Sequence, residues 1–297
     1  MNTNSYAESK DNTSRQPNKV PVKKRFDWLT LVAALGIVVG LALLAAPIIT
    51  DWHEAYKASK SIDTVVTIVD AMSAEEREQY LQQARAWNAS LTGELSEDFD
   101  LWPYKKQLSF HDSPMMSWVE IPSIQVKEPV YHGTDESALA AGVGHLQASS
   151  LPVGGASSHL VLTAHSGIPT QRMFDDIQKL QVGDVFVLWT MDMPYAYEVT
   201  NWEVVLPEEA PQYLKIVEGE DLATLITCTP YGVNSHRLLV HGKRCEYVPQ
   251  AAAPLGAYVN SRTQPFLIAI SSLMVLSVVL FAVRRIRSRK KTTYSEK

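Results

Sequence analysis

Two long runs without a charged residue bracket the chain and limit what it can fold into. Residues 29–49 are LTLVAALGIVVGLALLAAPII, and residues 265–283 form a second apolar run. At about 1.5 Å per residue, a helix over either run is long enough to cross a hydrocarbon layer of about 30 Å. Neither run has the polar face that a helix at a protein surface carries. We therefore predict two transmembrane helices, in preference to two buried core helices or a cleaved signal peptide.

Basic residues beside these runs set the expected orientation of the chain. Four precede the first run and six follow the second, namely Lys19, Lys23, Lys24, Arg25, Arg284, Arg285, Arg287, Arg289, Lys290 and Lys291. Positive flanks stay in the cytoplasm. We expect a cell-membrane protein with both termini cytoplasmic and residues 51–262 extracellular. That outer segment has 14 Lys and Arg against 28 Asp and Glu, an acidic balance that argues against nucleic-acid binding.

The regions between the runs differ in pattern and predict a series of segments. Residues 50–91 are expected to be a helical stalk, because Ser73-x-x-Glu76 resembles a capping box and an apolar face follows it. The first membrane helix is expected to end near Pro47. The full division is a cytoplasmic tail (1–28), a transmembrane helix (29–49), the stalk (50–91), a connecting loop (92–115), a β domain (116–248), a linker (249–264), a transmembrane helix (265–283) and a basic cytoplasmic tail (284–297).

Short strands separated by turn signals dominate the part of the chain after residue 115. We predict strands over 118–121, 129–131, 159–163, 184–189, 195–205, 223–229 and 237–241. Strands at this spacing are typical of a mainly β sandwich or closed barrel.

The segment TLITCTPYGVNSHRLLVHGKR, residues 224–244, contains the first candidate for chemistry. Cys228 lies near the end of a predicted strand, a turn follows at Pro230, and Arg237 opens the next strand. If the two strands pair as a hairpin, a permanently charged guanidinium lies beside an accessible sulfur. Two other interpretations stay open: a disulfide between Cys228 and Cys245, and a cysteine that is a small buried apolar residue.

A nucleophilic thiol needs a partner for its proton, and histidine is the natural candidate. His165 ends the apolar strand HLVLTAH and precedes a Ser-Gly turn, whereas His132 in VYHGT and His145 in GVGHL are rivals. A zinc site formed by the three histidines and Cys228 is a further alternative, although their spacing has no compact ligand pair. A purely structural or adhesive barrel is another.

The same residues resemble the sortases, the membrane-anchored cysteine transpeptidases of Gram-positive bacteria. TLITCTPYGVNSHRL resembles the signature of class C, the pilin-polymerising type, and VEIPSIQVKEPVYHGTDESALAAGVGHLQASSLPVGGASSHLVLTAHSG resembles the family's opening strands and histidine motif. The resemblance covers about residues 51–247 and the two flanking runs. It implies an eight-stranded β-barrel with Cys228 as nucleophile, His165 as general acid/base and Arg237 as oxyanion or substrate clamp, and it implies no metal or organic cofactor.

The function that this resemblance implies is pilus assembly. The enzyme would cleave an LPxTG-like sorting signal on a pilin through a thioacyl-enzyme and join the pilin to a lysine of the next subunit. Its partners would be LPxTG-bearing pilins and the membrane. The alternative within the family is anchoring of surface proteins to the cell-wall peptidoglycan, against which the second apolar run and the TPYGVNSHRL form weigh.

Two places depart from the family's usual pattern. Ala164 stands where a glycine usually precedes the histidine, and we expect this to be tolerated if the strand has an ordinary negative φ there. Class C sortases also carry a lid, formed by an aspartate and an aromatic residue two positions later. The match here is Asp100 and Trp102, with the proline after the tryptophan instead of between the two. The segment Asp112-Ser113-Pro114 is the second candidate for the lid.

Overall fold

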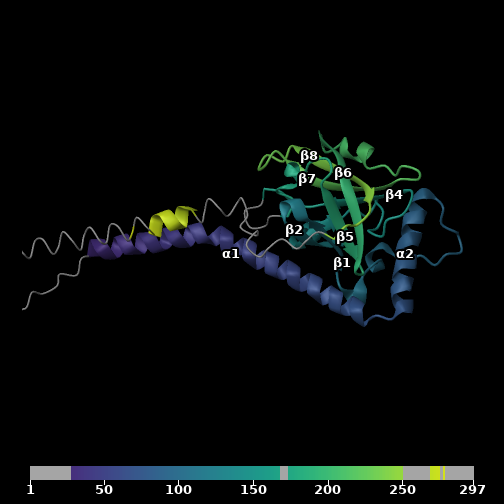
Figure 1. Ribbon diagram of the computed structural model, residues 1–297, viewed down its shortest axis with the longest axis horizontal. Helices are drawn as coiled ribbons and strands as arrows, with labels where there is room; N and C mark the ends of the chain where they lie inside the picture. Colours follow the sequence, from purple (N-terminus) through teal and green to yellow (C-terminus); the bar gives the residue numbers. More distant parts are fainter. Residues whose placement is uncertain (1–27, 168–172, 250–267, 275–276, 278–297) are drawn as a thin grey trace, which may run out of the picture. The chain divides into compact units, whose positions relative to one another are not determined.

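The computed structural model describes residues 28–167, 173–249, 268–274 and 277, and within these ranges eight strands close into a barrel. The order around the barrel is β1-β2-β3-β4-β7-β8-β6-β5. Figure 1 shows the strands gathered at one end of the picture, beside α2. The strands are β1 (Met115–Ile121), β2 (Val126–His132), β3 (Val143–His145), β4 (Ser158–Thr163), β5 (Val185–Thr190), β6 (Met193–Val205), β7 (Asp221–Thr229) and β8 (His236–Cys245). This confirms the mainly β fold and the eight-stranded barrel.

All seven strands that the sequence pattern predicts are present, and the eighth strand is the short β3. Its sequence, Val143-Gly144-His145, contains a glycine, a residue that is depleted in strands. The glycine is needed here because a Cβ on Gly144 would lie 2.5 Å from the Gly133 carbonyl oxygen. The strand is therefore fixed by a close approach of two backbones, which an alternation of apolar residues does not reveal.

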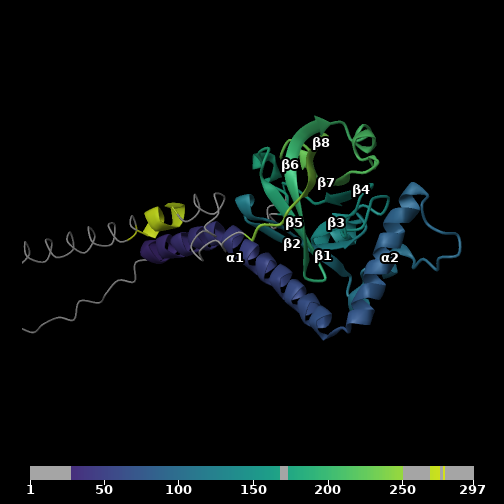
Figure 2. The ribbon, with the colours of Figure 1, turned by 45° about the vertical axis from the view of Figure 1, so that its right-hand side comes forward.

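The segment predicted as a stalk contributes to the core of the barrel domain. It forms the end of α1 (Trp28–Ala71) and all of α2 (Ala74–Thr92), and Figure 2 shows α2 beside the barrel. Leu81 and Ala84 of α2 are buried in the main apolar cluster. Asn88 fixes α2 further, because its amide exchanges two hydrogen bonds with the main chain of Leu151, at 2.7 and 3.3 Å. The predicted cap is confirmed, since Ser73 Oγ accepts from the Glu76 N–H at 3.1 Å.

The first helix is longer than its sequence predicts. The membrane segment is expected to end near Pro47, but no helix end lies there, because α1 runs through this position to Ala71. A proline inside a helix removes one hydrogen bond, and the strong helix formers around it outweigh that loss here. Among the described residues, none of the helices combines the length and the apolar character needed to cross a bilayer. Of the second predicted span, 265–267, 275–276 and 278–283 lie outside the described residues, as do residues 1–27, 250–264 and 284–297 of the predicted tails and linker.

The connecting segment 92–115 is more ordered than its irregular sequence pattern predicts. It contains two short 3-10 turns, η1 (Tyr104–Lys106) and η2 (Phe110–Asp112). Tyr104, Leu108 and Phe110 are buried in the main apolar cluster. The segment therefore fills one side of the core instead of only linking two parts of the chain. The remaining short elements are η3 (Pro122–Ile124), α3 (Glu136–Ala141), η4 (Ile177–Lys179) and η5 (Ala210–Tyr213).

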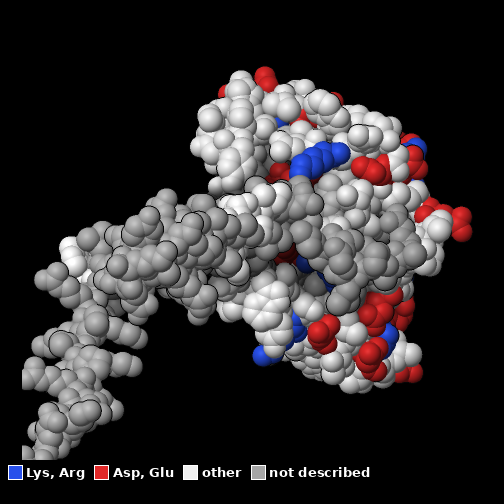
Figure 3. Space-filling model, turned by 60° about the vertical axis from the view of Figure 1, so that its left-hand side comes forward, with Lys and Arg blue, Asp and Glu red and all other residues white. Residues whose placement is uncertain are grey.

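Acidic side chains are spread over the surface of the barrel domain. Figure 3 shows Asp and Glu side chains at several places on the visible face, with fewer Lys and Arg between them. This distribution agrees with the composition of residues 51–262, which contain 28 acidic and 14 basic residues. The acidic surface is unlike the basic face of a nucleic-acid-binding protein.

Candidate active site

Cys228 and Arg237 lie directly opposite each other on paired strands. Strands β7 and β8 form the predicted hairpin, and its register makes Cys228 and Arg237 cross-strand partners. Side chains of directly opposite residues project from the same face with their Cβ atoms about 5 Å apart. The turn between the strands is closed by the N–H groups of Val233 and Asn234, which both donate to the Pro230 carbonyl at 3.0 Å. The hairpin therefore places Cys228 and Arg237 side by side on one face of the sheet, as the sequence predicts.

The Arg237 guanidinium is half-buried and held by the turn. Its Nη1 donates to the main-chain carbonyls of Asn234 at 3.2 Å and His236 at 3.1 Å. A guanidinium has five N–H donors in a rigid planar fork. One nitrogen can therefore anchor the group to the turn while the others remain available to an oxygen atom of a substrate.

His165 reaches the same rim of the barrel through the parallel pairing of β4 with β7. Thr163, the last residue of β4, pairs with Ile226. The pairing continues past the strand, because the Ala164 N–H donates to the Ile226 carbonyl at 3.1 Å. Two residues further along each of the two segments, the Ser166 hydroxyl donates to the Cys228 carbonyl at 2.6 Å. His165 is therefore level with the end of β7 at which Cys228 lies.

The described residues on either side of positions 168–172 are joined by hydrogen bonds, and Gly167 lies close to the β7–β8 turn. The Phe174 N–H donates to the His165 carbonyl at 3.2 Å, and the Gly167 N–H donates to the Asp175 carboxylate at 2.7 Å. Gly167 has a φ of +82°, and a Cβ there would lie 3.2 Å from the Gly232 nitrogen. Glycine is needed at this position. Ala164 does not have a positive φ, as expected from the sequence.

Two residues of this site, Ser166 and Asp175, have no clear signal in the sequence. Ser166 could have been considered because a hydroxyl directly after a strand often bonds to nearby backbone. Asp175 lies eight residues beyond its partner Gly167, at a separation that no turn rule covers. Both residues act on the backbone that carries His165 and Cys228, so they position the site.

A small hollow is lined in part by Cys228. Its volume is about 10 Å³, and it is lined by Ser166, Asp175, Gln178, Thr227, Cys228, Thr229, Tyr231 and Leu238. This is room for about one water molecule. A molecule larger than water must therefore approach from the open side of the rim or displace a neighbouring side chain.

The second cysteine is remote from this site. Both cysteines are free thiols, and Cys245 lies at the far end of β8, opposite Ala196. Eight residues separate Cys245 from Arg237, the partner of Cys228, which corresponds to roughly 27 Å along a strand. Burial, followed by the charge of Glu198, raises the pKa of the Cys245 thiol. The disulfide with Cys228 that the sequence left open is therefore not formed, and Cys245 is a poor nucleophile at neutral pH.

The two rival histidines are structural. His145 is fully buried, its Nε2 donates to the Ser150 carbonyl at 2.9 Å, and its Nδ1 accepts from the Tyr104 hydroxyl at 2.8 Å. His132 is also buried, between the Pro114 and Gln107 carbonyls at 3.3 and 2.5 Å. In the part of the chain that the structure describes, no three His, Cys, Asp or Glu side chains gather as metal ligands.

The buried imidazole of His145 predicts a loss of stability in acid. Desolvation lowers the pKa of His145 to about 4, whereas an unfolded histidine has a pKa near 6.5. The unfolded chain therefore takes up this proton first as the pH falls. We expect His145 to lower the free energy of unfolding by about 3 kcal/mol between pH 6.5 and pH 4. Denaturant titrations across this range should give a flatter pH dependence for His145→Gln than for the wild type. The exposed His53→Gln is the control, and equal slopes for wild type and His145→Gln would contradict the assignment.

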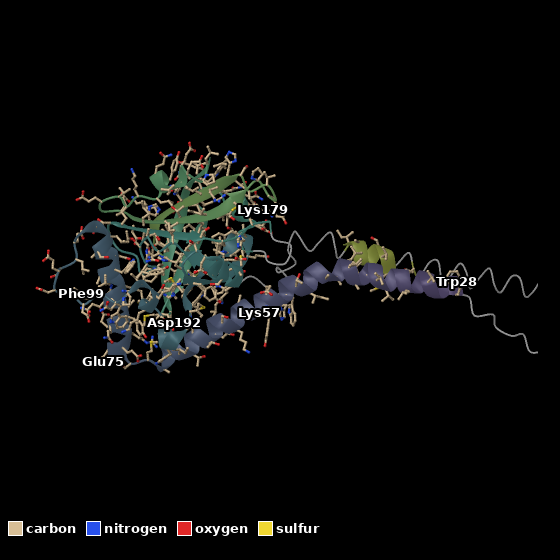
Figure 4. The ribbon with its side chains drawn as sticks, turned by 180° about the vertical axis from the view of Figure 1, so that it is seen from behind. Trp28, Lys57, Glu75, Phe99, Lys179 and Asp192 are labelled. Atoms are coloured by element: carbon tan, nitrogen blue, oxygen red, sulfur yellow. The ribbon has the colours of Figure 1, made fainter. Side chains whose placement is uncertain are left out.

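The residues predicted to form a lid contact α2 instead of the hollow. The Trp102 ring packs edge-on against Tyr80 with centroids 5.3 Å apart, and Lys106 Nζ lies 4.0 Å from its centroid. The Asp100 carbonyl accepts from the Gln83 amide at 2.9 Å. In Figure 4, Phe99 and Lys179, which is next to Gln178 of the hollow, lie at opposite sides of the barrel. The structure thus does not bring Asp100 and Trp102 to Cys228, and the lid role stays a prediction. The side chain of the second candidate, Asp112, lies outside the described set.

A thiol-reactivity experiment tests the predicted lid. If Trp102 covers the sulfur in solution, Trp102→Ala should raise the rate at which Cys228 reacts with a small thiol reagent by several-fold. Lys106→Ala, which removes the cation above the same ring, is a matched control that leaves the ring in place. An unchanged rate in Trp102→Ala would mean that Trp102 only packs against α2.

Comparison with known proteins identifies the family. A model of the sortase domain matches residues 119–245. Sortase A of Bacillus anthracis is 27% identical over 216 residues, which cover 72% of this chain and 92% of that relative. Sortase C1 of Streptococcus agalactiae is 36% identical with a TM-score of 0.59, over 64% of this chain and 100% of that structure. A Clostridium perfringens sortase C, solved with the C-terminal cell wall sorting motif, is 38% identical with a TM-score of 0.57, over the same shares. These class C neighbours and the domain match show that the chain belongs to the sortase family of cysteine transpeptidases.

Proposed function

We propose that this sortase joins pilin subunits into a covalent pilus, as class C enzymes do. The observation that carries the proposal is the pairing of Cys228 with Arg237 at the barrel rim, with His165 level with them at the end of β4. A nucleophile, a proton donor and a cationic donor to an oxyanion are the groups that acyl transfer needs. The likeness to class C sortases in structure supports the pilin class of substrate.

In the first half of the reaction, the sorting signal is cleaved. The Cys228 thiol passes its proton to His165, its sulfur attacks the carbonyl carbon of the threonine in an LPxTG-like signal, and the carbonyl oxygen becomes an oxyanion beside Arg237. The C–N bond to glycine then breaks, and His165 gives its proton to the leaving amine. The products are a thioester on Cys228 and a free glycine amine. The structure of the C. perfringens enzyme with a sorting motif supports a peptide of this class as substrate.

In the second half, a lysine amine of the next pilin takes the place of glycine. Its nitrogen attacks the thioester carbonyl, and His165 accepts a proton from the attacking amine. The C–S bond breaks, the isopeptide bond forms, and the sulfur of Cys228 is released for another cycle. Two covalent steps thereby replace one direct exchange of an amide.

The proposal includes two membrane anchors, at 29–49 and 265–283, with the barrel outside the cell. It is supported by the absence of charges in both runs and by the basic residues beside them. Anchoring enzyme and pilin to one surface raises their effective concentration without any new contact. Extraction of cell membranes at alkaline pH tests this part, because an anchored chain stays with the membrane pellet. Release of the intact chain into the soluble fraction would contradict it.

A competition between two acceptor amines tests the choice of function. The purified chain is given a labelled LPxTG peptide together with a lysine-bearing pilin domain or a peptidoglycan precursor amine. We expect the label to be joined to the pilin lysine, detected as a mass increase equal to the cleaved peptide. Joining to the wall precursor alone would favour the anchoring alternative, and no cleavage of the peptide would reject both.

A further inference from the structure

The outer face of the hairpin continues from the Cys228–Arg237 pair into two more residue pairs. Alternate residues of a strand share a face, so Ile226–Leu239 is the next pair on this face and Thr224–His241 is the one after. The first of these two pairs is buried and apolar, and the second is polar. Along this face, the apolar pair Ile226–Leu239, called the apolar step below, lies between the Cys228–Arg237 pair and the Thr224–His241 pair.

The loop over residues 206–220, between β6 and β7, covers this apolar step. Ala210 of η5 is buried in a cluster with Val161, Val205, Ile226 and Leu239. Tyr213 and Leu214 of the same loop pack against that cluster. Because Ile226–Leu239 is the next pair on this face after Cys228–Arg237, loop 206–220 packs on the part of the face that adjoins the Cys228–Arg237 pair. Its position decides how a peptide side chain can approach there.

A chain of hydrogen bonds from the sheet holds the middle of this loop. His159 Nδ1 lies 2.9 Å from the Lys215 carbonyl, and its Nε2 lies 2.7 Å from Thr224 Oγ. Thr224 Oγ in turn lies 2.8 Å from His241 Nδ1. Strands β4, β7 and β8 thus contribute one side chain each to a single series of hydrogen bonds, which ends at the Lys215 carbonyl of the loop backbone.

The direction of every bond in this chain follows from the carbonyl at its end. A carbonyl only accepts, so the proton of neutral His159 is on Nδ1 and its Nε2 is an acceptor. The Thr224 hydroxyl must then donate to His159 Nε2, and it accepts from the N–H at His241 Nδ1. Thr224 and His159 are 0% and 3% exposed, so water cannot replace a lost partner at either.

We infer that His159, Thr224 and His241 are positioning residues that hold loop 206–220 and thereby set the affinity of this hairpin face for the sorting signal. The inference rests on the proposed function, because it takes the hairpin face beside Cys228 as the surface that holds that signal. Burial lowers the pKa of both histidines, which keeps them neutral and keeps the bond directions fixed at physiological pH. None of the three residues touches the reacting atoms, so their effect is on binding and not on bond cleavage.

Two substitutions at Thr224 test this inference, one of which removes the hydroxyl at constant side-chain volume while the other keeps the hydroxyl. Thr224→Val keeps the volume and removes the hydroxyl, whereas Thr224→Ser keeps the hydroxyl. We expect Thr224→Val to raise KM for a labelled sorting peptide about tenfold, with kcat within about twofold of wild type, and Thr224→Ser to restore KM. Amide hydrogen exchange over residues 206–220 should be faster in Thr224→Val and should return to the wild-type rate in Thr224→Ser.

The two readouts separate this inference from the proposed function. If wild type cleaves no sorting peptide, the proposed function fails, while hydrogen exchange over the loop still decides whether the chain of bonds holds it. Unchanged KM and unchanged exchange in Thr224→Val would overturn the inference, and so would an equal loss in Thr224→Ser. If Thr224→Val does not fold, His241→Leu at a half-exposed position gives the second test. His241→Leu should raise KM and speed amide exchange over residues 206–220, as expected for Thr224→Val. Unchanged KM and exchange in His241→Leu would overturn the inference.

Discussion

Replacement of Cys228 by alanine should abolish transpeptidation and leave the barrel folded. The sulfur is the only atom lost, and every covalent step passes through it, so we expect cleavage of a sorting peptide to fall by at least about 10⁴-fold. Cys228 is half-buried at a strand end and contributes no side chain to the apolar cluster. Its loss should lower the free energy of unfolding by no more than about 1 kcal/mol. Peptide cleavage and a denaturant titration measure the two quantities on the same sample.

The second cysteine supplies the matched control for this experiment. Cys245→Ala removes an equal number of atoms from the far end of β8. It should leave cleavage at the wild-type level, because its thiol is remote from the His165 turn. Mass spectrometry of the wild type with peptide and no acceptor should show an adduct on Cys228 alone. An adduct on Cys245, or residual pilin joining in Cys228→Ala, would reject Cys228 as the nucleophile.

Local pairing made the cross-strand pairing of Cys228 with Arg237 predictable from sequence. A hairpin joins neighbouring strands, so the turn at Pro230-Tyr231-Gly232 fixes which residues oppose each other. His165 is different, because its place depends on the parallel pairing of β4 with β7 across more than 60 residues. No rule of spacing gives that register. The residue type and the strand end identified His165 as a candidate, and only the sheet order brings it to the same rim.

The sequence could not predict which surfaces the helices and loops pack against. The apolar face of α2 was visible in the pattern, but not that Leu81 and Ala84 pack into the barrel's core. A helical period tells which face is apolar and does not tell what covers it. Trp102 gives the same lesson, because an aromatic residue in a proline-bearing loop fits a lid and a packing contact equally well, and here it packs on Tyr80.

Replacement of Arg237 by lysine should reduce the rate strongly while the hairpin stays intact. The guanidinium anchors itself through Nη1 to the Asn234 and His236 carbonyls and still offers donors to a substrate oxygen. Lysine keeps the charge, but its single ammonium cannot keep the anchor and meet the oxyanion in a fixed geometry. We expect kcat to fall about 10²-fold, the usual cost of losing one preorganised donor to an oxyanion.

The way the loss divides between kcat and KM tells which role Arg237 has. A fall in kcat at constant KM identifies a donor to the oxyanion, because that contact forms only in the transition state. A rise in KM at constant kcat identifies a clamp on the bound peptide. Arg244→Lys on the same strand is the control, since its guanidinium stacks over Tyr195 at 4.7 Å and should affect stability alone. Wild-type kcat and KM in Arg237→Lys would mean that the guanidinium only closes the turn, and the acyl oxygen would then need another donor at this rim.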